Sequence, residues 1–402
     1  MKILMINKSD NGGGAAIAAT GIATALRKHS GCDVLFASAK ATEPGTVRLR
    51  NRAGWIIEET IDRITRKAGF EYMFLPFSKY GILKAATQFR PDIIHLHNIH
   101  SGYFETELIK ELAEKAPLIW SIHDMWALTG HCTVTKGCTK WETQCSECPH
   151  LDIYPALGRD STPGLFKRKL SIIQGTDITA ASPSEWIFSS LKKSPLWKGK
   201  KIEKVSYGID EELFRPLDKA DCRKNYGIRE NAFTVLLTAE KLTGGTKGEN
   251  LICDIMDLAA EKTGKETVLL TGGKTDLKFS SDKFRHIHAG YLDRKDMPLL
   301  YNCADVNVSP TSGEAFGLTI VEAGLCDVPS VVFDAGGTVS AMGEIQKHNL
   351  VKTGDISDLA AKLANIQNRE KPALRQYYAD NFSLKKCAGD FYSLYKEILE
   401  KK

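Results

Sequence analysis

The sequence predicts an α/β protein made of two Rossmann-like, doubly wound domains that face each other across a cleft. The chain has 402 residues, and a single hydrophobic core stops growing at about 250–300 residues, so two domains are expected. Short, near-continuously apolar runs alternate with helical patterns through both halves, as parallel strands covered on both faces do. Helices between successive strands then give each half a doubly wound sheet.

Ten apolar runs justify the expected strands. In the first half they are MKILMIN, CDVLFAS, PDIIHLHN, LIWSIHD and TDITAAS. In the second half they are FTVLLTAE, ETVLLTGG, RHIHAGYL, ADVNVSP and PSVVFDAGG. Helical patterns, such as those over 15–29 and 318–326, stand between these runs. The alternation predicts one parallel sheet in each half.

The domain boundary is expected where the stretch VSYGIDEELFRP passes from a strand into turn residues. We expect an N-terminal, acceptor-side domain over residues 1–205, with a Cys-rich insert near 131–150. A C-terminal domain that binds a nucleotide sugar is expected over 206–382. The pattern over 383–402 predicts a terminal amphipathic helix, which can cross back to the N-terminal domain.

Composition narrows the class of protein. Apolar residues make up 43% of the chain and charged residues 26%, as in globular proteins. The formal net charge of +5 is small for this length, so no nucleic-acid partner is expected. No apolar run is long enough to span a bilayer, and the first residues lack the features of an export signal. We therefore expect a cytoplasmic protein, with a peripheral position at the inner face of the membrane as the alternative.

The segment SPTSGEAFGLTIVEAG carries two glutamates beyond a predicted strand. In open α/β sheets ligands bind beyond the carboxyl ends of strands, and a helix N-terminus there attracts anions. The helix is expected to begin near Phe316 or Gly317, with Glu314 before it and Glu322 two turns along it. Amides on phosphate and carboxylates on hydroxyls suit a phosphate-bearing sugar. The alternative is that Glu314 caps the helix and Glu322 is a solvated helix charge.

These two glutamates, with seven residues between them, Phe-Gly after the first and Ala-Gly after the second, resemble the motif of glycosyltransferase family 4. That is a retaining family with the two-domain GT-B fold, and the resemblance is to its bacterial polysaccharide-biosynthesis members. It continues through Gly290-Tyr-Leu, where it implies that Gly290 is a donor-binding residue, and through 300–305 and 329–337. The resemblance implies that Glu314 faces the donor sugar and that Glu322 binds the ribose hydroxyls. It also implies that the donor-binding backbone amides belong to Phe316, Gly317 and Leu318.

The resemblance implies further donor contacts in two loops. Family members carry an Arg and a Lys that bind the diphosphate, and Lys247 matches the Lys. Lys241 stands in place of the Arg, with one extra residue between the two, and lacks the bidentate fork of an Arg. The alternative is that both are solvated loop lysines. Gly13 and Gly14 follow the first strand and permit close approach of a ligand, and the family places this turn against the diphosphate and the acceptor.

Histidines end two predicted strands. His123 follows LIWSI, and a lone histidine there is most often structural. The resemblance implies instead that His123 lies near an outer hydroxyl of the donor sugar. His97 and His100, in HLHNIHSGY, are weaker candidates for the acceptor side.

Four of the ten cysteines fall within 17 residues, at Cys132, Cys138, Cys145 and Cys148. Four thiolates suit tetrahedral zinc, and the Cys145-x-x-Cys148 spacing is that of a zinc knuckle. The alternative is a set of reduced, partly buried thiols. Similar inserts in the resembled family favour a structural clasp, so a structural zinc is one expectation, and no cofactor is expected to be required for catalysis.

A helical pattern over 52–67, RAGWIIEETIDRITRK, places apolar residues beside basic ones. It has two interpretations. The helix lies on an anionic membrane surface, or it packs on the core with its charges in solvent.

Together, the residues and the resemblance imply a hexosyl or glycosyl transferase of the EC 2.4 class with retaining chemistry. The donor is expected to be a UDP- or GDP-sugar, and the acceptor a saccharide or lipid-linked saccharide of cell-surface polysaccharide biosynthesis. The expected catalytic residues are Glu314, His123 and Lys247, with lysines and amides stabilising the diphosphate in place of a metal. The alternatives are a sugar-nucleotide epimerase or phosphorylase of the same fold, and a non-catalytic binding module with a zinc clasp.

Overall fold

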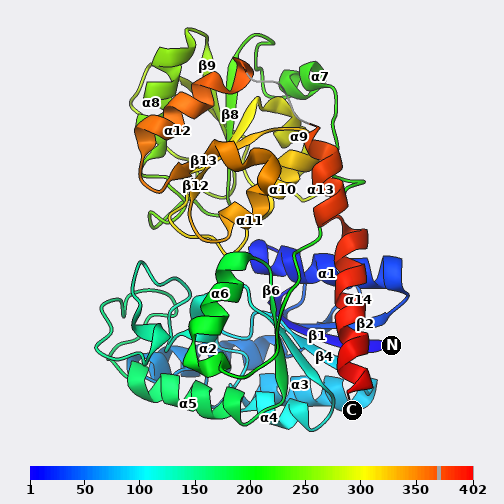
Figure 1. The fold of residues 1–402 in the computed structure, drawn as a ribbon. Coiled ribbons are helices and arrows are strands. Elements are labelled where there is room, and N and C mark those ends of the chain that lie inside the picture. The colour runs from blue at the N-terminus through cyan, green and yellow to red at the C-terminus, as the bar shows by residue number, and fades with distance from the viewer. Residues whose placement is uncertain (369–372, 402) are drawn as a thin grey trace. The chain divides into compact units, whose positions relative to one another are not determined.

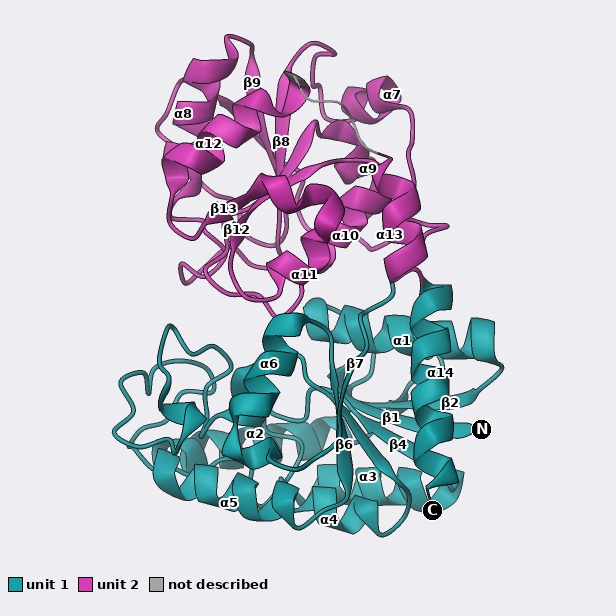
Figure 2. Cartoon of the chain, in the orientation of Figure 1, with its two compact units in different colours: residues 1–208, 384–402 teal, residues 209–383 magenta. Residues whose placement is uncertain are grey.

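The computed structural model describes residues 1–368 and 373–401 and divides the chain into two compact units (Figures 1 and 2). Unit 1 comprises Met1–Gly208 and Leu384–Lys402, and unit 2 comprises Ile209–Ser383. The division at residue 208 lies three residues after the boundary expected from the sequence. The described helices include none that is long and apolar enough to cross a membrane.

Unit 1 contains one seven-stranded parallel sheet in the order β3-β2-β1-β4-β5-β6-β7. Its strands are β1 Lys2–Ser9, β2 Asp33–Lys40, β3 Val47–Arg48, β4 Ile93–Leu96, β5 Leu118–Ser121, β6 Ile178–Ser182 and β7 Ile202–Lys204. Its α-helices are α1 Gly14–Ser30, α2 Arg52–Lys67, α3 Pro76–Phe89, α4 Leu108–Ala113, α5 Thr162–Gln174, α6 Glu185–Lys193 and α14 Leu384–Glu400. Short 3-10 helices cover Met125–Leu128, Lys140–Glu142 and Pro195–Trp197.

Unit 2 contains a six-stranded parallel sheet in the order β10-β9-β8-β11-β12-β13. Its strands are β8 Phe233–Thr238, β9 Thr267–Gly272, β10 Arg285–His288, β11 Val306–Ser309, β12 Ser330–Asp334 and β13 Leu350–Lys352. Its α-helices are α7 Lys219–Lys224, α8 Ile252–Thr263, α9 Met297–Cys303, α10 Leu318–Leu325, α11 Thr338–Met342, α12 Ile356–Asn365 and α13 Leu374–Phe382. Two 3-10 helices cover Glu344–Asn349 and Ile366–Asn368.

The predicted α/β class is confirmed, because both sheets are parallel and carry helices. Each of the ten apolar runs contains a strand. The strands that the sequence analysis did not predict, β3, β7 and β13, have two or three residues and lie at sheet edges. In both sheets the chain order reverses beside the first strand, between β1 and β4 in unit 1 and between β8 and β11 in unit 2. Such a switch point is where open α/β sheets bind ligands.

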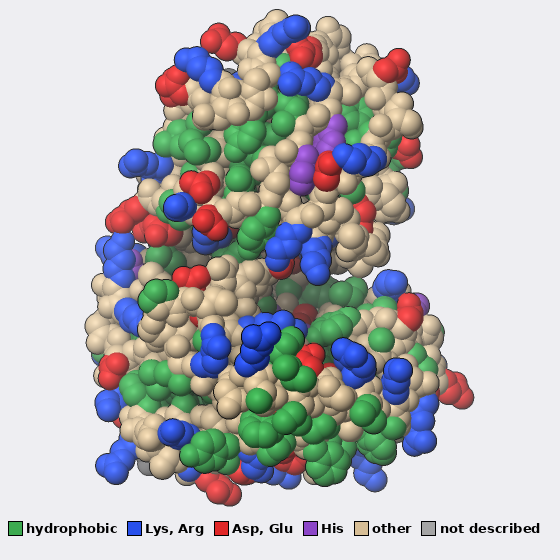
Figure 3. Space-filling model, turned by 180° about the vertical axis from the view of Figure 1, so that it is seen from behind, with side chains coloured by type: hydrophobic (Ala, Val, Ile, Leu, Met, Phe, Trp, Pro, Cys, Tyr) green, Lys and Arg blue, Asp and Glu red, His purple; other side chains and the backbone are tan. Residues whose placement is uncertain are grey.

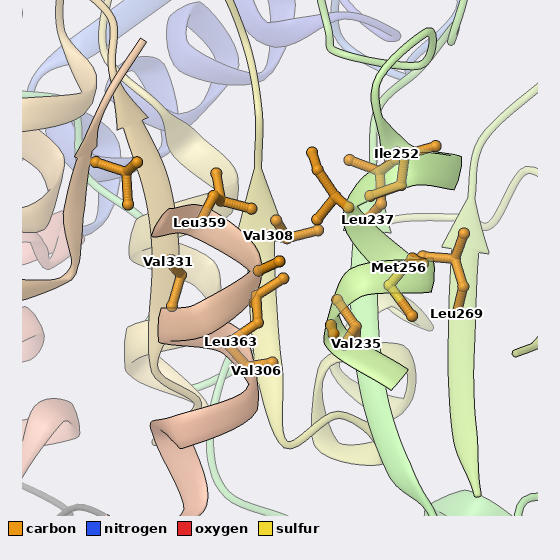
Figure 4. Packing of buried hydrophobic residues seen from close by; sticks show 14 of the residues in the cluster. Val235, Leu237, Ile252, Met256, Leu269, Val306, Val308, Val331, Leu359 and Leu363 are labelled. Carbon is orange, nitrogen blue, oxygen red and sulfur yellow. The ribbon is translucent and has the colours of Figure 1, made fainter. Parts of the chain in front are cut away.

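The core of unit 2 shows why the apolar runs are continuous. Strand residues such as Val235, Val308 and Val331 pack against Met256 of α8 and Leu359 of α12 (Figure 4). Because helices cover the sheet, consecutive strand residues are buried, and β8 reads FTVLL with all five residues buried.

The C-terminal helix α14 belongs to unit 1. Leu384 and Ala388 share a buried cluster with Ala25 of α1. Further along, the hydroxyl of Tyr395 lies 2.7 Å from Nδ1 of His95 on β4. Apolar and polar contacts therefore both fix α14 to the unit that contains the N-terminus.

Helix α2 corrects one of the two interpretations of residues 52–67. Its buried residues are Gly54, Glu58 and Asp62, whereas its isoleucines at 56, 57 and 64 are exposed. The core-packing interpretation with solvated charges is therefore wrong about the faces of this helix. The physical reason is that Glu58 lies on the inner face of α2, where it accepts hydrogen bonds from Arg50 and from Ser78.

Candidate functional site

Glu314 and Lys247 form an ion pair at the switch point of unit 2. Lys247 lies in the loop after β8, and Glu314 lies in the loop after β11. Nζ of Lys247 is 2.5 Å from Oε2 of Glu314, and the side chains are 36% and 28% exposed. Because both remain accessible, a ligand can replace either partner. The pair therefore offers a cation and an anion to a ligand at the carboxyl ends of these strands.

The backbone of Glu314 is fixed by the loop after β12. Its N–H donates to the carbonyl of Ala335 at 3.2 Å, and its carbonyl accepts from the N–H of Gly337 at 2.6 Å. A Cβ on Gly337 would lie 2.1 Å from the carbonyl oxygen of Ala315. Only glycine permits this approach, so Gly337 positions the carboxylate that the sequence analysis selected.

A second glycine brings Lys247 to Glu314. Gly248 has a φ of 78°, and a Cβ there would lie 2.3 Å from the carbonyl oxygen of Pro310. Next to it, the carbonyl of Thr246 accepts hydrogen bonds from the Ser312 N–H at 3.0 Å and from the Thr311 hydroxyl at 2.8 Å. The loop after β8 is thus joined to the loop after β11 by backbone contacts.

The helix α10 begins beside this pair without a side-chain cap. Its N-cap is Gly317, with a φ of 112°, and its first helical residue is Leu318. No acidic residue lies in the first turn. The interpretation of Glu314 as the helix cap is therefore wrong. The positive end of the α10 dipole has no capping carboxylate. Phe316 is buried, with its ring against Phe382 at 5.6 Å between centroids.

Glu322 is a buried acid with two partners. Its residue exposure is 4%. Its Oε1 lies 2.7 Å from Nη1 of Arg294, and its Oε2 accepts from the hydroxyl of Tyr301 at 2.6 Å. The interpretation as a solvated helix charge is wrong. Arg294, which also lies 4.8 Å from the ring centroid of Phe214, was missed by the sequence analysis. The signal that would have found it is that a buried carboxylate needs a cation.

The other unit 2 candidates differ in their surroundings. Gly290, with a φ of 76°, accepts a hydrogen bond at 2.9 Å from the N–H of Gly273. Lys241 is exposed and has no polar partner in the part of the chain that the structure describes. A further cation, Lys274, was not selected from the sequence. It pairs with Glu240 at 2.6 Å and lies 4.6 Å from the ring centroid of Tyr291.

In unit 1 the glycine turn begins α1. Gly13 is the N-cap, with a φ of 77°, and Gly14 is the first helical residue. The first turn of α1 has no acidic side chain. The turn follows β1, at the switch point of the unit 1 sheet, so its geometry suits an anion.

The unit 1 histidines form a chain of contacts. Nδ1 of His123 lies 2.5 Å from the hydroxyl of Tyr207, and its Nε2 lies 3.1 Å from Nδ1 of His97. His100 contacts Asp124 at 2.7 Å. Burial lowers the pKa of His123 to about 4. His123 is therefore neutral near pH 7, and its ring offers hydrogen bonds and no positive charge. Tyr207, near the end of the first segment of unit 1, was not predicted.

The four clustered cysteines line one small pocket together with Trp141. The backbone N–H of Gly130 contacts Sγ of Cys145 at 3.2 Å, and His131 contacts Sγ of Cys148 at 3.4 Å. Within residues 1–368 and 373–401, no group of three or more His, Cys, Asp or Glu side chains is arranged to hold a metal ion. The geometry is thus that of neighbouring free thiols, and the zinc at Cys132, Cys138, Cys145 and Cys148 stays a prediction.

A separate cavity of unit 2 lies away from these residues. Asp305, Pro329 and Asn349, which each directly precede a strand, contribute to its lining. It therefore opens at the amino ends of the strands, opposite to the switch-point loops, and does not belong to the candidate site.

Two family models match the chain, one in each unit. Residues 12–147 match the model described as Glycosyltransferase Family 4, and residues 245–381 match the model described as Glycosyl transferases group 1. The chain belongs to the group 1 glycosyltransferases. The second match includes Lys247, Glu314 and Glu322, and the first includes the glycine turn and the histidines.

Curated relatives support this family. The chain is 32% identical over 91 residues to a protein of Escherichia coli K12 named as the colanic acid biosynthesis glycosyl transferase WcaC, which covers 21% of this chain and 22% of that protein. It is 27% identical over 305 residues to D-inositol 3-phosphate glycosyltransferase 2 of Catenulispora acidiphila, which covers 71% of this chain and 65% of the relative. The chain thus matches less than two thirds of the length of either relative.

Solved structures of glycosyltransferases share the fold. The sucrose-phosphate synthase of Thermosynechococcus elongatus aligns over 100% of both chains, with a TM-score of 0.71 and 17% identity. HepE of Anabaena, solved in complex with UDP-glucose, aligns over 99% of this chain and 100% of its own, with a TM-score of 0.66 and 16% identity. These similarities confirm the GT-B fold class.

We expect substitution of Gly248 to separate the two loops that bear Lys247 and Glu314. In Gly248→Ala the new methyl group overlaps Pro310, and such overpacking costs about 1–3 kcal/mol. Gly244→Ala is the matched control, because Gly244 also has a positive φ, of 87°, but nothing lies within 4 Å of its Cβ position. Differential scanning calorimetry measures both. Equal melting temperatures for the two variants would contradict the packing described here.

We also expect unit 1 to lose stability in acid. Burial lowers the pKa of His95 to about 3 from an ordinary 6.5. Between these pH values the unfolded chain binds a proton that the folded chain does not. The stabilising contribution is therefore complete above about pH 6.5 and falls, by at most about 1.4 kcal/mol for each pH unit, as the pH drops toward 3.

His95→Gln should reduce the change of the free energy of unfolding with pH, whereas substitution of the exposed His29 by Gln should not. All six tryptophans lie between residues 55 and 197, so tryptophan fluorescence in denaturant titrations at several pH values reports on unit 1. An unchanged slope in His95→Gln would show that His95 is not responsible.

Proposed function

We propose that this protein transfers a sugar from a nucleotide-sugar donor to a saccharide or lipid-linked saccharide, with retention of configuration. The observation that carries the proposal is the Lys247–Glu314 pair beside the uncapped N-terminus of α10. A nucleoside diphosphate sugar needs a cation and amides for its phosphates and acceptors for its hydroxyls. This edge of unit 2 presents those groups on two adjacent loops.

In the proposed mechanism, Lys247 exchanges Glu314 for the diphosphate when the donor binds. The cost of this exchange is small, because a partly exposed ion pair contributes only about 0–1 kcal/mol. The amides of Phe316, Gly317 and Leu318 and the dipole of α10 bind the distal phosphate. As the bond from the sugar to this phosphate breaks, negative charge grows on the leaving oxygen, and the same groups stabilise it without a metal.

The released carboxylate of Glu314 is then free to accept hydrogen bonds from the donor sugar. Glu322 is proposed to bind the ribose hydroxyls. Each of its oxygens already accepts one bond, from Arg294 and from Tyr301, and a carboxylate has about four acceptor positions in all. The two partners therefore orient the carboxylate and leave it capacity for a ligand.

For unit 1 we propose contacts with the reacting sugars. His123 is neutral near pH 7, and Tyr207 and His97 fix its ring orientation. It offers a hydrogen bond to a sugar hydroxyl, while Gly13 and Gly14 allow close approach of the diphosphate or acceptor. The family resemblance implies attack by the acceptor hydroxyl on the face from which the diphosphate leaves, and we propose this course of reaction for the present chain.

Two of the similar proteins favour a UDP-sugar as the donor and a polysaccharide as the product. HepE of Anabaena was solved with UDP-glucose, and the similar Escherichia coli protein is named for colanic acid biosynthesis. A GDP-sugar remains the second donor to test. Mass spectrometry of the products distinguishes transfer from the alternatives, since an epimerase converts the donor without an acceptor and a binding module leaves it unchanged.

We expect Lys247→Ala to lower turnover by about 10²-fold or more, the effect of removing one preorganised electrostatic donor. Lys241→Ala should have a smaller effect, because Lys241 is exposed and unpaired in the described structure. Lys262→Ala, which removes an exposed lysine of α8, is the control for charge alone. Steady-state release of the nucleoside diphosphate measures all three. Turnover in Lys247→Ala equal to that of the control would exclude the proposed leaving-group role.

A further inference from the structure

The helices α2 and α3 and the loop between them carry most of the exposed large hydrophobic side chains of the described chain. Of the 12 exposed large hydrophobic residues in the described chain, eight lie between residues 55 and 80. They are Trp55, Ile56, Ile57, Ile64, Phe70, Phe74, Phe77 and Tyr80, and we call them the α2–α3 surface. Single exposed hydrophobic residues are ordinary in proteins, but a contiguous patch indicates an interaction site.

A buried network of charges fixes the orientation of α2. Arg50 lies 2.8 Å from Glu58, and the Ser78 N–H donates to Glu58 at 2.9 Å. Asp62, also buried, pairs with Arg66 at 2.9 Å. Rotating the helix to bury its isoleucines would expose this network and leave Arg50 unpaired in the interior, which is costly. The buried charges therefore keep the apolar face of α2 directed outward.

The hydrophobic residues of α3 continue those of α2. A Cβ on Gly54 would lie 2.8 Å from Cγ of Phe77, so Gly54 lets the Phe77 ring pack directly on α2. Between the helices, Phe74 has a φ of 61° and is 67% exposed. Its neighbours Tyr72 and Leu75 are fully buried and anchor the loop on both sides of it. The structure thus presents the Phe74 ring to solvent from a fixed backbone.

Positive charge accompanies the apolar residues. Arg52, Arg63 and Lys67 are exposed on α2, and none has an ion-pair partner in the described residues. At 100° for each residue, Arg63 and Lys67 project to the same side of the helix as Ile56 and Ile64. On α3, the ammonium of Lys84 lies 5.9 Å from the centroid of the Tyr80 ring. Seen from behind, unit 1 has hydrophobic side chains gathered beside Lys and Arg side chains (Figure 3).

We propose that the α2–α3 surface binds the surface of an anionic phospholipid bilayer. Aromatic and aliphatic side chains enter the boundary between headgroups and acyl chains, while neighbouring Lys and Arg side chains contact lipid phosphates. Exposed Trp, Tyr and Phe side chains with unpaired cations beside them match this layered environment. Because no described helix can span a membrane, the contact is peripheral.

The charges disfavour a second copy of this chain as the occupant. In a two-fold symmetric dimer the same patch lies on both subunits, so Arg63 and Lys67 would approach the same residues of the other copy. Like charges in such a contact repel, whereas anionic headgroups neutralise them. The inference does not require the proposed sugar transfer, since it concerns binding without donor or acceptor.

Vesicle flotation of the full chain without nucleotide sugar tests the proposal. The vesicles contain phosphatidylethanolamine with phosphatidylglycerol, or phosphatidylcholine alone. The test variant combines Ile56→Ser, Ile57→Ser and Ile64→Ser, which are exposed changes. Leu299→Ser, at a residue 36% exposed in unit 2, is the matched control. Circular dichroism checks that each variant is folded.

We expect the wild-type chain and Leu299→Ser to float with anionic vesicles. The triple variant should bind these vesicles at least about tenfold more weakly. Arg63→Gln with Lys67→Gln should reduce the preference for anionic lipid. The tryptophan fluorescence of the wild-type chain should shift to shorter wavelength when it binds vesicles. Trp55→Phe should remove most of that shift.

Three results would overturn the proposal. They are absence of wild-type binding to anionic vesicles, equal binding of the triple variant, and a dimer in sedimentation that the triple variant abolishes while vesicles stay unbound. The last would assign the surface to a second copy. Donor turnover in solution is measured separately, so failure here does not affect the proposed reaction.

Discussion

The close approach of the loops that carry Lys247 and Glu314 is the constraint on which the candidate site depends. Two loops from adjacent central strands meet there, and each is brought to the meeting point by a glycine. Gly248 allows close contact with Pro310, and Gly337 allows close contact with Ala315. These contacts are between backbone atoms, so they fix the positions of the charged side chains without depending on the charges themselves.

Because backbone contacts fix the two loops, the charged side chains of Lys247 and Glu314 are available to a ligand. A half-exposed ion pair adds little to stability, so the fold does not need Lys247 and Glu314 to remain paired. A ligand with an anionic and a hydroxyl-bearing part can replace both partners at small cost. Glu322 differs, because its burial and its bonds to Arg294 and Tyr301 keep it in one orientation. The site thus combines an exchangeable pair with a fixed carboxylate.

The sequence was a good guide to the sheets and a poorer one to contacts between loops. All ten apolar runs contain strands, because buried parallel strands leave a continuous apolar signal. Periodicity also located α2 but gave no reliable account of its faces. An amphipathic pattern states that two faces differ, and only the partners Arg50 and Ser78 show that Glu58 is on the inner one.

The motif located Glu314 and Glu322, and the family similarity supplied their expected roles. It did not identify Arg294, Lys274 or Tyr207, since each of these acts through a partner distant in sequence. The capping interpretation of Glu314 was wrong for a related reason. An acid just before a helix resembles a cap in the sequence, but here Gly317 starts the helix and Lys247 takes the carboxylate.

A crystal structure of the full chain with a bound UDP-sugar tests the central claim most directly. The account predicts density for the diphosphate at the N-terminus of α10, with Nζ of Lys247 within hydrogen-bonding distance of a phosphate oxygen and no longer on Glu314. A nucleotide bound at another edge of the sheet, with the Lys247–Glu314 pair intact, would contradict it.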